Sequence, residues 1–234
     1  MGKYAILLLG LRNIGGNMNF IALKKVIINL PKLMLGFMII AIGINLTIYA
    51  DMGLNPWGTF HQGISRITHL TFGIVTQLTG IFIIVMSLFI KIHPGIGTIL
   101  NMFFIGFLVD IFDAMKIIPH SESLAIRIIY LLIGTFLFNY GIYIYMSCAL
   151  GAGPRDGLLV GLVKLTGISV SFMRPIIEVT IVLTGILLGG SYGIGTLLNA
   201  FGGGYILNTV FKFYKFNPKE VKQMKISDLL LSNT

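Results

Sequence analysis

Two ionisable side chains, Arg174 and Glu178, lie four residues apart within an apolar stretch of the sequence. At this spacing they share one face of a helix and can form an ion pair. A carboxylate inside a membrane span is costly, so such a residue is a functional candidate by default. Two interpretations remain open: an ion pair that only softens the cost of burial, or a group that binds a solute or carries a proton.

Two asparagines, Asn101 and Asn199, occupy matching places in two other apolar stretches. Each lies six residues after the glycine that opens its stretch, about 9 Å deep in a helix that rises ~1.5 Å per residue. Buried amides in a membrane either hydrogen-bond neighbouring helices together or line a polar site. Both roles remain open for this pair.

Prolines at positions 56 and 154 mark two breaks, where an apolar run ends and a shorter segment begins. Proline suits the first position of a helix, because its missing N–H would have no partner there. A helix start can present free N–H groups to an anion, although each break could equally serve only to redirect the chain. With the side chains beside these prolines, the candidate substrate-binding residues are Asn55, Trp57, Asn101, Arg155, Asp156, Arg174, Glu178 and Asn199.

Other chemistry has little support in the sequence. The four histidines are scattered, and the single cysteine, Cys148, excludes an intrachain disulfide and a thiolate metal site. No nucleophile–base set, paired catalytic carboxylates or phosphate-binding loop stands out. We therefore expect no bound metal, no cofactor and no enzymatic activity.

The composition indicates an integral membrane protein. Hydrophobic residues make up 56% and charged residues 11% of the chain, and its mean hydropathy is +0.91. A soluble domain typically carries about 25% charged residues. The net charge of +9 therefore indicates basic loops and a basic tail rather than binding of nucleic acid.

Six apolar segments come close to the ~20 residues that cross a bilayer. They span residues 33–50, 73–90, 95–115, 124–148, 172–190 and 193–211. Segments 56–70 and 154–168 are shorter and charged, so we expect short helices there rather than spans. With both termini in the cytoplasm, fourteen of the seventeen Lys and Arg residues lie inside, as the positive-inside rule requires.

The second half of the chain repeats the first at an offset of 98 residues. Seven of the ten glycines between residues 33 and 115 meet a glycine at this offset, and the run that begins at Gly95 returns at Gly193. Three spans per copy is an odd number, so the copies must insert in opposite orientations. We therefore expect an all-α polytopic membrane protein with six transmembrane helices, arranged as two inverted three-helix repeats with a short extra helix after the first span of each.

These motifs resemble those of the YczE/YyaS/YitT family of bacterial membrane proteins. The resemblance rests on Met52-Gly-Leu-Asn-Pro-Trp-Gly58, Leu150-Gly-Ala-Gly-Pro-Arg-Asp-Gly157 and the two Gly-Ile-Gly-Thr-x-Leu-Asn runs, and covers about residues 33–213. It implies a multi-pass protein of the cytoplasmic membrane and little about its chemistry.

The expected organisation has four parts. Residues 1–32 form an N-terminal cytoplasmic segment, 33–117 and 124–213 the two membrane repeats, and 214–234 a basic cytoplasmic tail. An alternative hypothesis for residues 1–17 is that the start codon is misassigned and that the protein begins at Met18. We expect the tail to lie along anionic lipids of the inner leaflet.

The duplication favours a small transporter or permease for an unidentified small solute, with its site between the halves. The alternative is a non-transporting membrane scaffold that serves a partner protein. Either protein could also form a homo-oligomer.

Overall fold

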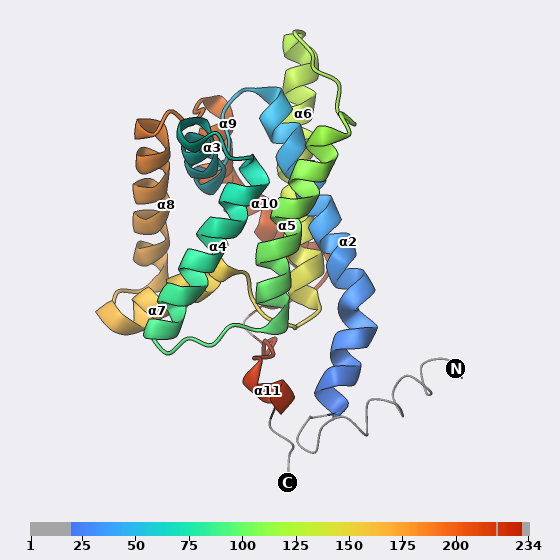
Figure 1. Ribbon diagram of the computed structural model, residues 1–234, viewed down its shortest axis with the longest axis vertical. Helices are drawn as coiled ribbons and strands as arrows, with labels where there is room; N and C mark the ends of the chain where they lie inside the picture. Colours follow the sequence, from blue (N-terminus) through green and yellow to red (C-terminus); the bar gives the residue numbers. More distant parts are fainter. Residues whose placement is uncertain (1–19, 219, 231–234) are drawn as a thin grey trace, which may run out of the picture.

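The computed structural model describes residues 20–218 and 220–230, and this part of the chain is helical with no strand (Figure 1). The misassigned-start hypothesis concerns residues 1–17, which lie outside the described residues. The elements in chain order are α2 (Phe20–Ala50), α3 (Pro56–Thr68), α4 (Phe72–Phe89), α5 (Ile96–Ala114), α6 (Leu124–Ser147), α7 (Pro154–Thr166), α8 (Val170–Leu187), α9 (Ile194–Leu197), η1 (Leu198–Gly202), α10 (Gly203–Phe213) and α11 (Ser227–Leu230).

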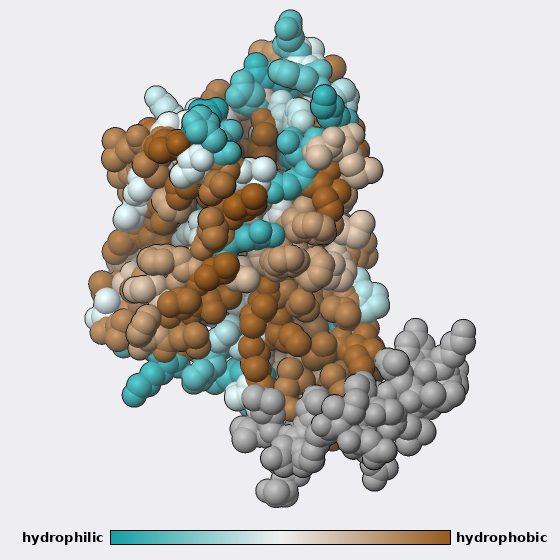
Figure 2. All heavy atoms as spheres, viewed as in Figure 1, coloured by the Kyte–Doolittle hydropathy of each residue, from teal (hydrophilic) through white to brown (hydrophobic). Residues whose placement is uncertain are grey.

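Among the described residues, five helices are long and apolar enough to cross a membrane, namely α2, α4, α5, α6 and α8. Many large apolar side chains on them face outward, such as Phe89 and Leu187. Figure 2 shows apolar residues over most of the visible surface, with hydrophilic residues gathered mostly toward the two ends. The polytopic helical membrane protein expected from composition is therefore confirmed.

The sixth predicted segment is helical but not a single α-helix. It is divided into α9, the π-helical turn η1 and α10, which follow one another without a gap. Three successive glycines, at positions 202–204, lie at the junction of η1 and α10. Glycine has a low helix propensity, and π turns of this kind are frequent at functional sites.

Helix α2 begins earlier than predicted. The expected span started at residue 33, but the helix starts at Phe20 and continues through Pro31 for 31 residues. At ~1.5 Å per residue it is about 46 Å long, more than the ~30 Å of hydrocarbon in a bilayer. The residues before Leu33 therefore extend the helix beyond the span, and Lys24, Lys25 and Lys32 on it are exposed.

Helices α2 and α6 pack closely along their length, as their adjacent ribbons in Figure 1 show. Small residues at the crossing make the close approach possible. A Cβ atom on Gly43 would lie 2.8 Å from the carbonyl oxygen of Gly134, and one on Gly141 would lie 2.8 Å from that of Gly36. These four glycines therefore allow the backbones of α2 and α6 to approach closely.

We call residues 51–55, before α3, the first break, and residues 149–153, before α7, the second break. The N–H of Gly195 donates to the carbonyl of Met52, and the N–H of Gly97 donates to that of Leu150, each at 2.8 Å. Each break is thus bonded to the helix start of the opposite half. Of the two short helices that follow the breaks, α3 lies beside the upper part of α8 and α7 lies near its lower end in Figure 1.

Candidate substrate-binding cavity

A cavity of about 400 Å³ lies among the starts of both short helices and the helices around them. Both breaks contribute to its wall, as do residues of α2, α4, α5, α6, α8, η1 and α10. All eight candidate residues named from the sequence line it: Asn55, Trp57, Asn101, Arg155, Asp156, Arg174, Glu178 and Asn199. The volume lies at the lower end of the range typical of small-molecule sites.

The starts of α3 and α7 meet at this cavity. Both helices begin with proline, as predicted, and the side chain of Asn55 caps α3 by accepting from the N–H of Gly58 at 2.9 Å. The guanidinium carbon of Arg155 lies 4.8 Å from the centre of the Trp57 ring. These two residues occupy equivalent places in the repeat, since their numbers differ by 98.

The charged residues of the cavity differ in their partners. The Arg174 Nε lies 3.0 Å from Glu178 Oε1, so the predicted intrahelical ion pair is formed and also lines the cavity. Tyr145 donates its hydroxyl to Asp156 at 3.4 Å. Within the described part of the chain, the Arg155 guanidinium has no hydrogen bond or ion pair besides its contact with Trp57.

The two asparagines also differ. Asn199 Nδ2 donates to the carbonyl of Gly195 at 2.8 Å and to Thr135 Oγ1 at 3.3 Å, so this amide ties η1 to α6. The Asn101 side chain has no hydrogen bond among residues 20–218 and 220–230, although it lines the same cavity. The sequence left two roles open for these amides. Asn199 has the structural role, because its side chain joins neighbouring helices, and Asn101 exposes its amide to the cavity.

Comparison with known proteins assigns the family. Residues 27–212 match the model of a family of unknown function, DUF6198. The chain belongs to the DUF6198 family. Its homologues include the uncharacterised membrane protein YczE of Bacillus subtilis, 37% identical over 174 residues that cover 74% of this chain and 80% of YczE.

Two further relatives support the same assignment. An uncharacterised protein of Haemophilus influenzae is 35% identical over 72% of this chain and 76% of its own. The uncharacterised protein YyaS of Bacillus subtilis is 26% identical over 74% of this chain and 88% of its own. The resemblance to YczE and YyaS seen in the motifs is therefore confirmed, and no solved structure gives a significant match.

The cavity of this DUF6198 protein has polar residues that sequence reasoning missed, above all His61. The sequence suggests an amphipathic α3 at the membrane interface with His61 on its polar side, but the ring is only 2% exposed. Thr76 Oγ1 lies 3.0 Å from His61 Nδ1 and 2.9 Å from the carbonyl oxygen of Phe72. His61 Nε2 has no hydrogen-bond partner in the described structure.

Asn139 and Tyr145 of α6 were also missed. Both line the cavity, and both lie within an apolar run where nothing in the sequence distinguishes them from packing residues. His61 did carry a signal, because it lies one helical turn after Trp57 and so shares its face.

The C-terminal tail is docked on the second break. The N–H of Met224 donates to the carbonyl of Ala149 at 3.1 Å, and Gln223 Oε1 accepts from the N–H of Gly151 at 3.0 Å. The N–H of Ile226 donates to the carbonyl of Pro94. This part of the tail therefore packs against the protein, whereas the sequence suggested only contact with lipid.

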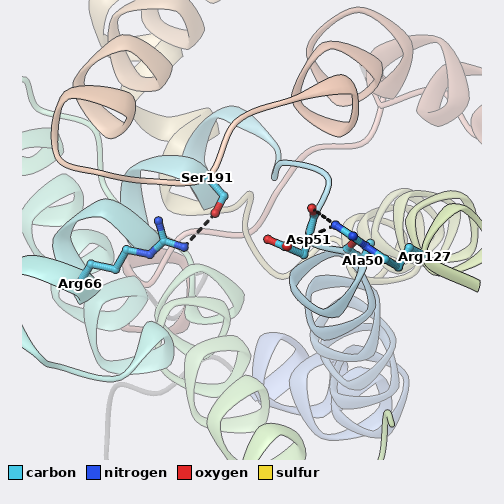
Figure 3. Close-up of polar contacts among 5 residues, drawn as sticks. All are labelled: Ala50, Asp51, Arg66, Arg127 and Ser191. Atoms are coloured by element: carbon cyan, nitrogen blue, oxygen red, sulfur yellow. Dashed lines mark hydrogen bonds and ion pairs between the residues drawn. The ribbon is translucent and has the colours of Figure 1, made fainter. Parts of the chain in front are cut away.

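The first break is held by Arg127, and a second arginine, Arg66, contacts the loop before α9. Arg127 of α6 donates to the carbonyls of Ala50 and Asp51 and pairs with the Asp51 carboxylate at 3.2 Å (Figure 3). Arg66, at the end of α3, donates to Ser191 Oγ at 2.9 Å in the same view. Both arginines therefore have structural partners within the protein.

Proposed function

We propose that this protein is a small transporter or permease of the bacterial cytoplasmic membrane, and that the cavity binds its solute. The architecture that we infer is two inverted repeats of three spans, related by a pseudo-twofold axis in the membrane plane. Secondary transporters with this plan bind their solutes near the bilayer midplane, between the repeats.

Pairs of contacts that are related by the offset of 98 residues support the inverted repeats. The bond from Gly97 to Leu150 is the counterpart of the bond from Gly195 to Met52. The approach of Gly43 to Gly134 corresponds, at the same offset, to that of Gly141 to Gly36. Exchanging the two halves turns each of these contacts into the other member of its pair. A twofold axis between the halves produces this arrangement.

The same architecture supports six crossings. We assign the sixth to α9, η1 and α10, which together cover Ile194–Phe213. The start of α2 contacts α11, so the two ends of the described chain lie together. With an even number of crossings, both termini are on one face, and the excess of basic residues places that face in the cytoplasm.

The observation that carries the proposal is the contact between Trp57 and Arg155 in the wall of the cavity. Equivalent residues of two repeats can touch only close to the axis that relates them. The cavity is therefore between the halves, where rocking of one repeat against the other would open it to either face.

Cysteine accessibility tests this proposal without knowledge of the solute. In a Cys148→Ser background, Thr79→Cys and Ile142→Cys place thiols in the cavity wall. A membrane-impermeant thiol reagent should modify both from either face, in right-side-out and in inverted vesicles. Phe89→Cys, at a side chain that is 81% exposed on the apolar surface, is the control that should stay unmodified.

Modification of the cavity thiols from one face only would contradict alternating access. That result would favour the scaffold alternative, in which the cavity is a fixed recess. We also propose that exposed lysines of the docked tail, Lys222 and Lys225, face anionic lipids of the inner leaflet.

A further inference from the structure

We propose that the cavity binds a small organic anion, and that the guanidinium of Arg155 binds its carboxylate. This proposal rests on the solute-binding role proposed above and adds the chemical class of the solute. The proposal is based on which charged side chains of the cavity already have a partner and which have none.

Arg155 is charged, lines the cavity and has its N–H donors free of any hydrogen bond or ion pair in the described structure. The face of the guanidinium lies against Trp57, whose ring centre is 4.8 Å from the guanidinium carbon. A contact with the face of a ring leaves the N–H groups at the edge of the guanidinium available. Five donors without acceptors are costly away from bulk water.

The two carboxylates of the cavity are already engaged. Glu178 is paired with Arg174, and Asp156 accepts from Tyr145 and lies next to Arg155 in the chain. A cationic solute would therefore have to displace an existing partner and would be repelled by two arginines. A neutral solute would leave the guanidinium without a charged acceptor.

A carboxylate on the solute is the group that fits the free N–H donors of Arg155. It accepts two parallel N–H bonds from one guanidinium, an arrangement stronger and more specific than a single neutral bond. The Asn101 amide, which lacks a hydrogen bond in the described chain, lines the same cavity as a further donor. Ile83, Ile105 and Ile142 form apolar wall for the body of the solute. A volume of about 400 Å³ limits that body to a small molecule.

Trp57 provides the measurement, because it is the only tryptophan in the chain. Its emission reports on the space beside Arg155 in the full-length, detergent-purified protein. Iodide is a small anionic quencher of tryptophan, and acrylamide is a neutral one. The competitors are benzoate and its uncharged analogue benzamide, at constant ionic strength.

We expect saturable quenching by iodide that benzoate reverses and benzamide does not. Arg155→Gln should weaken benzoate competition roughly tenfold or more, as for the loss of a charged hydrogen-bond partner. Acrylamide quenching should be the same in both proteins, which shows that the variant is folded. Arg155→Lys should retain iodide quenching and lose most of the advantage of benzoate, because a lysine cannot bind bidentately.

Linear iodide quenching that is equal in the wild-type and Arg155→Gln proteins would overturn the proposal. Equal competition by benzoate and benzamide would also overturn it, because the site would then not recognise charge. These outcomes are separate from those of the cysteine experiment. If the cavity thiols react from both faces but quenching does not depend on Arg155, the protein transports a solute of another class. If quenching depends on Arg155 but the thiols react from one face only, the protein binds an anion and does not transport it.

Discussion

The two breaks share one framework and differ in the chemistry that it supports. Each has a glycine at a positive φ, 95° at Gly53 and 131° at Gly151. Each is followed by a proline-started helix, and each accepts one N–H from the opposite half. Residues that build the framework are therefore the same in both copies.

The charged residues that line the cavity are not shared by the two copies. Trp57 of the first copy is Arg155 in the second, and Thr76 and Gly80 become Arg174 and Glu178. The four charged residues named for the cavity all come from the second half. The comparison indicates that the glycines and prolines of the breaks are kept in both copies for structural reasons, whereas the charges of the cavity are specific to the second copy.

The breaks also differ in how the rest of the chain fastens them. Arg127 holds the first break from within the membrane domain. The second break is held by Gln223 and Met224, from a tail that has no counterpart after the first repeat. The contacts of the tail with the second break can therefore be removed by truncation, without a change in any membrane-spanning helix.

The largest effect should come from the shared framework. Gly53→Ala and Gly151→Ala should each destabilise the protein by about 3 kcal/mol or more, because the new Cβ combines an unfavourable backbone conformation with a clash. That Cβ would lie 2.5 Å from the Gly193 nitrogen in one case and 2.7 Å from Thr98 Oγ1 in the other. Monodisperse yield on size exclusion would measure the loss.

Gly167→Ala is the matched control for this pair. Gly167 has a φ of 73° but open space around its Cβ position, so only the conformational cost of about 1–2 kcal/mol should remain. Equal losses at all three glycines would show that the reciprocal packing of the breaks contributes nothing.

A smaller effect should follow from breaking the ion pair that only the second half has. Glu178→Gln leaves Arg174 uncompensated, which should lower the apparent melting temperature by the equivalent of about 1–2 kcal/mol. The estimate is modest because 54% of the Arg174 side chain is exposed. The double variant Arg174→Leu with Glu178→Leu should regain most of the stability.

Function separates the two roles of this pair. We expect Glu178 to take part in transport, so the double variant should be stable but inactive in vesicle uptake of the solute. A stable double variant with full activity would reduce the pair to a structural feature of α8.

Removing the tail should loosen the second break alone. Truncation after Lys222 deletes the residues that bond to Ala149 and Gly151, with a loss of about 1 kcal/mol per hydrogen bond. Cys148 is the only cysteine in the chain, is 1% exposed and precedes this break directly. The truncated protein should therefore react faster with a thiol reagent.

Arg127→Ala, which releases the first break instead, should leave the rate of Cys148 modification unchanged. Faster modification in both variants would mean that the breaks open together rather than separately.

The smallest effect should distinguish the asparagines. Asn199→Ala removes two hydrogen bonds and should lower stability by about 1–2 kcal/mol. Asn101→Ala removes none in the described structure, so its melting temperature should stay close to that of the wild type. Equal losses in a thermal-shift assay would assign both amides to packing.

Sequence reasoning identified much of this framework because membrane segments and glycine repeats leave strong signals. The spans, both short helices and the close glycine contacts follow from apolar length, proline position and the offset of 98. The extension of α2 through Pro31 could not be predicted in this way, because proline usually ends a helix. Here the turns on either side of Pro31 are held by the rest of the fold.

The cavity could be predicted only in part. Charges within apolar runs identify Arg155 and Glu178, but Tyr145 and Asn139 have no such signal. The docking of Met224 on Ala149 depends on a contact between residues 75 apart in the chain, which no local pattern encodes.

The central claim is that the two halves are inverted copies around one cavity, and labelling of an equivalent pair tests it most directly. Thr68 ends α3 and Thr166 ends α7; both are exposed, and their numbers differ by 98. In a Cys148→Ser background, an impermeant thiol reagent outside the cell should modify Thr68→Cys and leave Thr166→Cys intact, with the reverse in inverted vesicles. Modification of both from the same face would contradict the inverted architecture.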